Sequence, residues 1–223
     1  MSATIYIVDD DPSFRTSIGR LLQACGYAVS LHETGETLLA HLPKPSGSSC
    51  ILLDVRIPGV SGPELQARLN ELGFHVPVVF LTGYGDISTA VQVIKAGAED
   101  LLTKPVTKEQ LLAAIERALA RGRVRQEQDG KLEGLQRLVA GLTPRERQVF
   151  ERVAVGAMNK QIAYELGTSE RTVKAHRHNV MEKLGVGSLA DVVLIAERLG
   201  VLTEARSEKG QPSTHRKGGN SQP

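Results

Sequence analysis

The chain has 223 residues, of which 41% are hydrophobic and 23% are charged, and its net charge is +2. These proportions are ordinary for a globular cytosolic protein. The charge is uneven, because residues 1–120 contain 13 acidic and nine basic residues, whereas residues 121–223 contain 12 acidic and 18 basic residues. This asymmetry indicates two domains, and the basic second one suits a polyanionic partner.

Cysteine content and hydropathy exclude several classes of protein. Cys25 and Cys50 are too few and too isolated for a disulfide framework or a zinc site. The N-terminus lacks a basic start followed by an apolar core, and no apolar run approaches membrane-spanning length. We therefore expect a cytoplasmic protein without a membrane partner.

Residues 4–120 alternate short apolar segments with segments of 3.6-residue periodicity. The apolar segments predict strands at 4–8, 28–31, 49–53, 78–81 and 100–102. The periodic segments predict helices at 12–24, 36–41, 63–71 and 87–96, and a fifth helix that starts after Thr107. This alternation predicts an α/β domain, with a doubly wound five-stranded parallel sheet, over residues 1–120.

Polar residues stand at the ends of four predicted strands. Asp9 and Asp10 follow the first strand and Asp54 follows the third, while Thr82 and Lys104 follow the last two. The carboxyl ends of parallel strands meet at the edge where open α/β sheets bind ligands. Each residue alone would suit a solvated turn, but their coincidence at four strand ends favours a common pocket.

Hard oxygen ligands in such a pocket suit Mg²⁺ or Mn²⁺. We expect Asp10 and Asp54 to be direct ligands, Asp9 to act through water, and the backbone carbonyl of Arg56 to complete the set. A carboxylate held there can attack a phosphoryl donor and form an aspartyl phosphate. Lys104 would then neutralise one phosphoryl oxygen, and the hydroxyl of Thr82 would bind another.

The motifs V-D-D, L-L-D-x-R-x-P, L-T-G and L-T-K-P occur in this order. By them, residues 4–120 resemble the receiver domain of two-component response regulators, which has the flavodoxin/CheY-like fold. The resemblance implies that Asp9 and Asp10 form an acidic pair and that Asp54 is the phosphoacceptor. It also implies that Thr82 provides a switch hydroxyl and that Lys104 binds the phosphate. The Lys104-Pro105 peptide would be cis.

Three positions bear on how such a receiver would work. Leu101 occupies the place where receivers usually have a Tyr or Phe, so the coupling of Thr82 to the surface differs, or Leu101 is simply a smaller core residue. The resemblance also implies that Arg56 and Tyr84, both bulky, stand at positions that flank the path of the hydrolytic water in receivers. They predict a long-lived phosphoryl group on Asp54.

After residue 120 the pattern changes. Residues 121–140 are charged and interrupted by glycines, which predicts a partly helical linker. Residues 141–200 then have a helical pattern only, which predicts a small all-α, four-helix domain, and residues 201–223 predict a disordered tail. The helix starts are signalled by capping residues at Thr143, Asn159, Ser169 and Ser188.

The helices at 160–166 and 170–184, joined by a tight turn, predict a helix-turn-helix. The longer helix has an apolar back that includes Val173 and Val180, and a polar front suited to the major groove of DNA. Its neighbourhood is basic, although a solvated basic face is the common alternative for a single charged helix. The candidate charges for phosphates and bases are Lys160, Arg171, Lys174 and Arg177.

The order L-T-P-R-E-R-x-V-F, N-K-x-I-A and T-S-x-R-T-V-K-x-H-R closely resembles the LuxR/NarL-type DNA-binding domain over residues 140–200. The resemblance implies that Lys174, Ala175 and His178 face bases. It also implies that Thr168, Ser169 and Arg171 support phosphate contacts or capping, as do Asn159 and Lys160, and that Glu146 anchors the first helix of the domain.

We expect a response regulator of the FixJ/NarL type, phosphorylated on Asp54 by a sensor histidine kinase. Phosphorylation would promote a homodimer that binds double-stranded DNA and acts with RNA polymerase. One alternative is a constitutive DNA-binding regulator whose receiver only dimerises. A remoter one is a Mg²⁺-dependent phosphohydrolase, which would want an acid where Arg56 stands.

Overall fold

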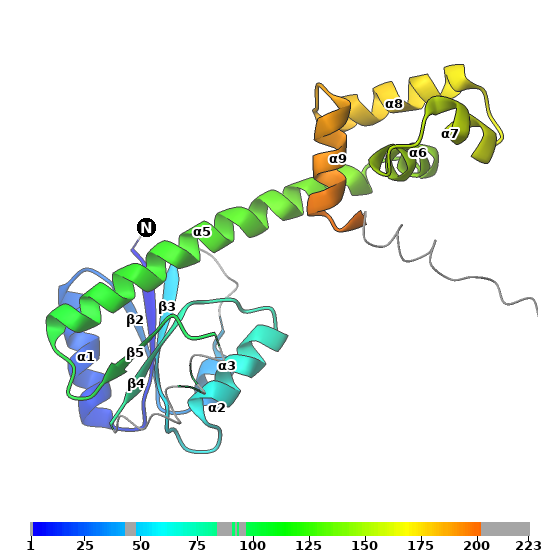
Figure 1. The fold of residues 1–223 in the computed structure, drawn as a ribbon. Coiled ribbons are helices and arrows are strands. Elements are labelled where there is room, and N and C mark those ends of the chain that lie inside the picture. The colour runs from blue at the N-terminus through cyan, green and yellow to red at the C-terminus, as the bar shows by residue number, and fades with distance from the viewer. Residues whose placement is uncertain (1, 43–47, 84–90, 92, 94–96, 202–223) are drawn as a thin grey trace, which may run out of the picture. The chain divides into compact units, whose positions relative to one another are not determined.

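The computed structural model describes residues 2–42, 48–83, 91, 93 and 97–201. Its N-terminal part contains a sheet of five parallel strands in the order β2-β1-β3-β4-β5 (Figure 1). The strands are β1 (Thr4–Val8), β2 (Ala28–His32), β3 (Ser49–Asp54), β4 (Val78–Thr82) and β5 (Asp100–Thr103). This confirms the predicted parallel sheet and places β1 next to β3 in its centre.

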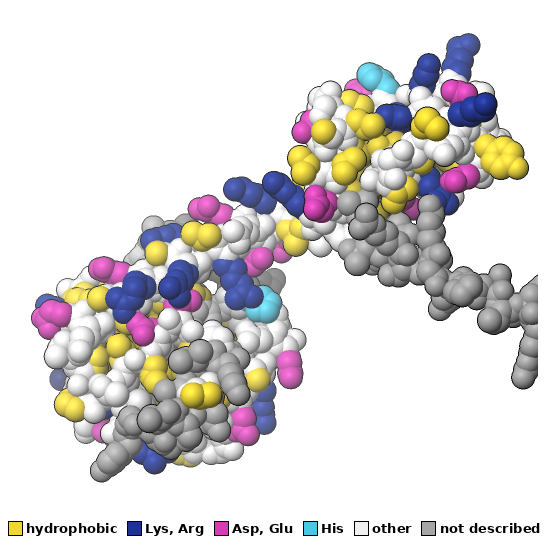
Figure 2. Space-filling view, in the orientation of Figure 1, with side chains coloured by type: hydrophobic (Ala, Val, Ile, Leu, Met, Phe, Trp, Pro, Cys, Tyr) yellow, Lys and Arg dark blue, Asp and Glu magenta, His cyan; other side chains and the backbone are white. Residues whose placement is uncertain are grey.

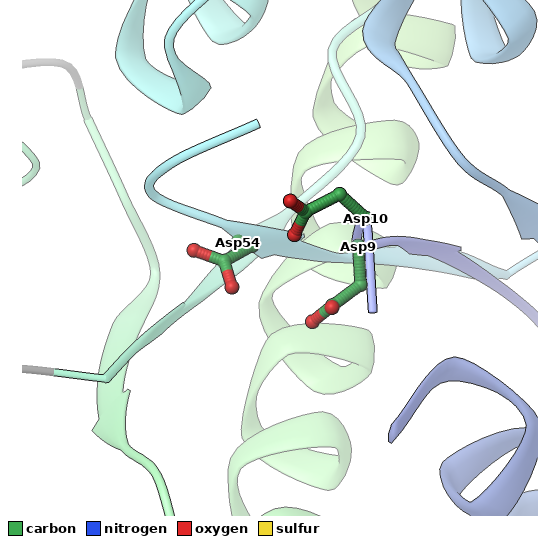
Figure 3. Close-up of side chains that lie close together, drawn as sticks. All are labelled: Asp9, Asp10 and Asp54. Carbon is green, nitrogen blue, oxygen red and sulfur yellow. The ribbon is translucent and has the colours of Figure 1, made fainter. Parts of the chain in front are cut away.

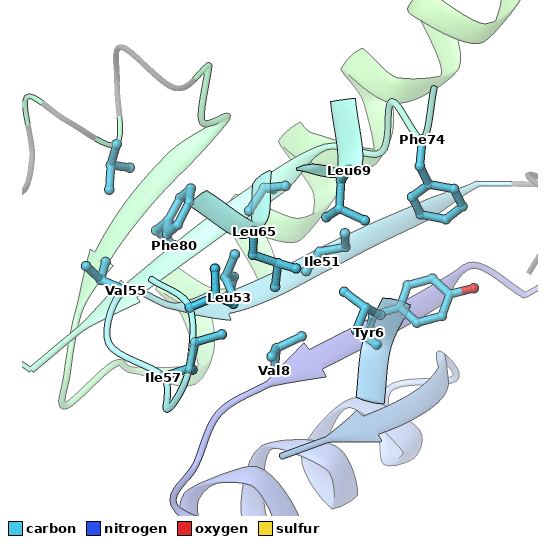
Figure 4. Close-up of a cluster of buried hydrophobic side chains, with 14 residues drawn as sticks. Tyr6, Val8, Ile51, Leu53, Val55, Ile57, Leu65, Leu69, Phe74 and Phe80 are labelled. Carbon is cyan, nitrogen blue, oxygen red and sulfur yellow. The ribbon is translucent and has the colours of Figure 1, made fainter. Parts of the chain in front are cut away.

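Helices cover both faces of this sheet (Figure 1). Because side chains alternate along a strand, Ile5 and Ile7 of β1 pack toward α1 (Pro12–Ala24) and the start of α5 (Lys108–Ala140). Tyr6 and Val8 of the same strand pack into the opposite core (Figure 4). That core also receives the apolar side chains of α2 (Gly35–Ala40) and α3 (Gly62–Glu71).

The start of α3 passes very close to the end of β3. A Cβ atom added to Gly62 would lie 2.7 Å from the carbonyl oxygen of Asp54 and 2.8 Å from Cε1 of Phe80. The amide N–H of Gly62 donates to the carbonyl of Val55, with a nitrogen–oxygen distance of 3.0 Å. A glycine is therefore required for α3 to support the strand end that presents Asp54.

The two cysteines occupy opposite environments. Cys50 lies in β3 and is fully buried, so that burial raises the pKa of its thiol. Cys25 follows the last residue of α1 and is exposed. Burial in the central strand therefore shields the thiol of Cys50, whereas the thiol of Cys25 is open to solvent.

Helix α5 is continuous from Lys108 to Ala140, and it includes the segment for which the sequence predicts a partly helical linker. The chain divides into two compact units, Met1–Glu127 and Gln128–Pro223. The second unit contains α6 (Pro144–Ala154), α7 (Asn159–Glu165), α8 (Glu170–Leu184) and α9 (Leu189–Arg198).

One of the predicted capping residues is wrong. The N-cap residue of α7 is Met158 and Asn159 is already helical; the backbone N–H of Met158 donates to Oε1 of Gln161. Thr143, Ser169 and Ser188 do cap their helices with side-chain oxygens. Most of the helix predicted at 87–96 and residues 202–223 of the predicted tail lie outside the described residues, whereas Val201 packs against the core of the second unit. No helix in the described part of the chain is long and apolar enough to span a membrane.

Candidate functional site: an acidic pocket and a basic helix

Three carboxylates meet at the carboxyl edge of the sheet (Figure 3). Val8 pairs with Leu53 in adjacent parallel strands, so the residues that follow them, Asp9 and Asp54, emerge side by side. One oxygen from each of Asp9, Asp10 and Asp54 lies within 4.8 Å of the others. Asp9 is fully buried and Asp54 is 8% exposed, whereas Asp10 is exposed. The three acids that the sequence places at strand ends are therefore brought together.

Lys104 bridges two of these acids. Its Nζ lies 2.6 Å from Oδ2 of Asp9 and 2.5 Å from Oδ2 of Asp54. Burial alone would lower the pKa of Lys104, but the hydrogen bonds and charges of the two carboxylates outweigh it, so its pKa is raised. Burial also raises the pKa of Asp9, against the lowering effect of Lys104. The ammonium thus compensates negative charge in a pocket that is largely shielded from water.

Backbone contacts hold the edge of the pocket in place. The N–H of Arg56 donates to Oδ1 of Asp54, and the backbone N–H of Lys104 donates to the carbonyl of Thr82, at nitrogen–oxygen distances of 2.8 and 2.7 Å. Thr82 is buried, and the Lys104-Pro105 peptide is cis. β3, β4 and the loop after β5 therefore present Asp54, Thr82 and Lys104 on one rim.

The donor set fits a divalent cation with hard character. All three side chains offer carboxylate oxygens, which Mg²⁺ prefers, and their spacing allows one ion to reach each of them directly or through water. The hydrogen bond from its own N–H fixes the backbone of Arg56 beside Asp54. Mn²⁺ prefers the same ligands.

Sequence reasoning did not identify two residues of α1 that contact the pocket. The ring of Phe14 lies under the Lys104 ammonium, 4.2 Å from Nζ to the ring centroid, and a guanidinium N–H of Arg15 donates to the carbonyl of Asp9. Asp11, the third acid of the run, caps α1 through the N–H groups of Ser13 and Phe14. A Phe three residues after a helix cap gives no sequence signal for a contact with the residue that follows β5.

Leu101 packs against the core on the α2 and α3 side of the sheet. Its side chain is half-buried there. Tyr84, which the sequence pairs with Arg56 at the mouth of the pocket, lies outside the described residues. Arg56 itself is exposed, so its side chain points to solvent beside Asp54.

In the second unit, α8 has one buried and one exposed side. Val173, Val180 and Leu184 are buried in the core of the unit. Figure 2 shows Lys and Arg side chains standing out over α8. Most residues expected to contact DNA are exposed on α7, α8 or the turn between them, namely Lys160, Ser169, Arg171, Lys174, Ala175 and His178. Thr168 and Arg177 are half-buried.

Two polar contacts tie α8 to the rest of its unit. The guanidinium of Arg177 donates to Oδ1 of Asn159, so this arginine links α8 to the start of α7. Lys183 donates to Oε2 of Glu146 at 2.6 Å, and the N–H of Thr143 donates to the same oxygen at 2.8 Å. These contacts, led by the one from Lys183, lower the pKa of Glu146 to about 2. Glu146 therefore anchors both α6 and α8.

Family models match both parts of the chain. Residues 5–116 match the response regulator receiver domain, and residues 140–196 match the LuxR family of bacterial regulatory proteins. Nodulation protein W of Bradyrhizobium diazoefficiens is 41% identical over 199 residues, which are 89% of this chain and 87% of that protein.

The chain belongs to the two-component response regulators.

Other relatives of this response regulator agree. The transcriptional regulatory protein FixJ of Azorhizobium caulinodans is 41% identical over 90% of this chain and 94% of its own length. The solved structure of the response regulator StyR matches with a TM-score of 0.74 and 42% identity, covering 89% of this chain and 100% of that one. Full-length FixJ from B. japonicum matches with a TM-score of 0.54 and 38% identity, covering 88% and 97%. This response regulator is a transcription regulator with a receiver and a DNA-binding domain, and it is not a conventional enzyme.

Proposed function

We propose that Asp54 is the phosphoacceptor of this response regulator and that a sensor histidine kinase is the phosphoryl donor. The observation behind this proposal is that the Lys104 ammonium contacts Asp9 and Asp54 together. A pocket with two buried carboxylates and one ammonium can accept a divalent cation and a phosphoryl group. The carboxylates would balance the charge of the cation, and the ammonium would balance that of the phosphoryl group.

In the transfer, a carboxylate oxygen of Asp54 forms a bond to phosphorus while the bond from phosphorus to the kinase imidazole breaks. The electron pair of the broken bond stays on the imidazole nitrogen. Mg²⁺, or Mn²⁺, would be held by Asp10 and Asp54, by Asp9 through water and by the carbonyl of Arg56, and it would neutralise the phosphoryl oxygens. Lys104 leaves Asp54 for one phosphoryl oxygen, and the Thr82 hydroxyl binds another.

The phosphorylated receiver is proposed to form a homodimer that binds double-stranded DNA through α8. Lys174, Ala175 and His178 supply the base-facing front, and Arg171 and Lys160 lie beside it for phosphates. Thr168 and Ser169 hold the turn, and Arg177 positions α8 through Asn159. Such a dimer would act on transcription with RNA polymerase, and since its partners are a kinase domain and the chromosome, we place the protein in the cytoplasm.

The test is molar mass by light scattering with Mg²⁺, with and without beryllofluoride, for the wild type and Asp54→Asn. We expect a monomer-to-dimer shift in the wild type only. An unchanged mass under all conditions would favour a constitutive DNA-binding regulator whose receiver is not a switch. That alternative is kept by Leu101, which replaces the aromatic residue usual in receivers.

A further inference from the structure

The first turn of α1 holds the base of Phe14 firmly. Oδ1 of Asp11 accepts hydrogen bonds from the N–H groups of Ser13 and Phe14, at nitrogen–oxygen distances of 2.8 and 3.2 Å. The Phe14 side chain is half-buried and packs against the apolar cluster between the sheet, α1 and α5. The ring therefore has a fixed backbone and a packed body, and one of its faces is turned to the Lys104 ammonium at 4.2 Å.

The other partners of this ammonium are the groups that the proposed cation and phosphoryl group would occupy. Lys104 contacts Oδ2 of Asp9 and Oδ2 of Asp54, and both carboxylates belong to the acidic pocket. When Asp54 and Asp9 turn their charge to a cation, these two contacts weaken. An aromatic face attracts an ammonium through its quadrupole but is not a ligand for Mg²⁺, so the contact with Phe14 does not compete with the cation.

We propose that Phe14 is a positioning residue of the phosphoacceptor site. Its ring keeps the Lys104 ammonium at the pocket while the ammonium exchanges the carboxylate of Asp54 for a phosphoryl oxygen. The inference rests on the proposed role of Asp54 and adds a residue from α1 to the residues of that site. The Lys104 side chain is 18% exposed, so its contact with the Phe14 ring is partly shielded from water and stronger than at an open surface.

The experiment is a calorimetric titration of the full-length protein with beryllofluoride in excess Mg²⁺, which measures the binding affinity. Phe14→Leu keeps an apolar side chain and removes the aromatic face, whereas Phe14→Tyr keeps the face. We expect the affinity to fall about three- to tenfold in Phe14→Leu and to stay within about twofold of the wild type in Phe14→Tyr. The same substitution to Leu in a Lys104→Met background should have no further effect, because the ammonium is absent.

Two results would overturn the proposal. One is an affinity of Phe14→Leu equal to that of the wild type; the other is an equal loss with and without Lys104, which would mean that the ring supports the fold generally. If the wild type itself binds no beryllofluoride, the proposed phosphoacceptor role fails instead. Urea unfolding in a chelator then still tests the contact between Phe14 and Lys104. It compares the wild type, Phe14→Leu, Lys104→Met and the double variant. Coupled effects on the free energy of unfolding support the contact, and additive effects reject it.

Discussion

Gly62 shows how one residue can decide the geometry of the acidic pocket. An added methyl group would meet the carbonyl oxygen of Asp54 and the ring of Phe80, both of which belong to central strands. We predict that Gly62→Ala lowers the free energy of unfolding by about 1–3 kcal/mol, because backbone must move. Urea unfolding measures this. Gly83→Ala is the matched control, since its methyl group meets no described atom within 4 Å, and an equal loss in both variants would contradict the argument.

At the same scale, the sequence identified the residues whose position follows from strand ends and missed those that depend on packing. Asp9, Asp54 and Lys104 follow apolar runs, and parallel pairing alone brings such positions to one edge. Phe14 and Lys104 are 90 residues apart along the chain, and their contact depends on how α1 packs on the sheet. The wrong cap at Asn159 has a similar cause, because its side chain binds Arg177 of another helix.

Among the helices, the link between α6 and α8 depends on pH through Glu146. The pKa of this carboxyl is about 2 in the folded protein, below its ordinary value of 4.5, so it stabilises the fold above pH 4.5 and this stabilisation is lost as the pH falls toward 2. We predict that Glu146→Gln lowers the unfolding midpoint near pH 6 and that its difference from the wild type shrinks below pH 4. Glu151→Gln, which removes a solvent-accessible ion pair with Arg147 within α6, is the control. A difference that is constant with pH would reject the ion pair with Lys183 as its cause.

Helix α5 contains three glycines at which substitution by alanine should have different effects on stability. The added methyl groups of Gly130→Ala and Gly134→Ala meet no described atom within 4 Å, and each replacement should stabilise the helix by about 0.5–1 kcal/mol. In Gly122→Ala the methyl group would lie 2.8 Å from Cγ of Pro77, so this variant should gain less or lose stability. Hydrogen exchange of the α5 amides distinguishes them. Equal protection in all three variants would contradict the described contact with Pro77.

Helix continuity was the least predictable feature of the elements. Glycine within a charged segment lowers helix propensity, which is why the sequence indicates a linker over residues 121–140. Leu135 and Val139 of this segment nevertheless pack into the core of the second unit, together with Leu142 after it. Such packing can extend a helix that local preferences would interrupt.

For the whole molecule, the buried apolar residues fall into clusters that each belong to one compact unit. We predict two calorimetric transitions. Phe80→Ala should destabilise the unit with the sheet, and Phe150→Ala the helical unit, each by about 3–5 kcal/mol. If both substitutions shifted one common transition by the same amount, the units would not unfold separately.

The placement of the two thiols allows the local opening of the sheet to be measured by thiol labelling. In native conditions a thiol reagent should modify Cys25 rapidly, while Cys50 reacts only in those molecules whose central strand has become accessible. The ratio of the slow rate to the rate of an open thiol then gives the opening equilibrium without any denaturant. Since Cys50 and Asp54 share one strand, a phosphoryl analogue bound at the strand end should slow the labelling of Cys50 and leave that of Cys25 unchanged. Chemical labelling in the strand's interior would thus report what is bound at its tip.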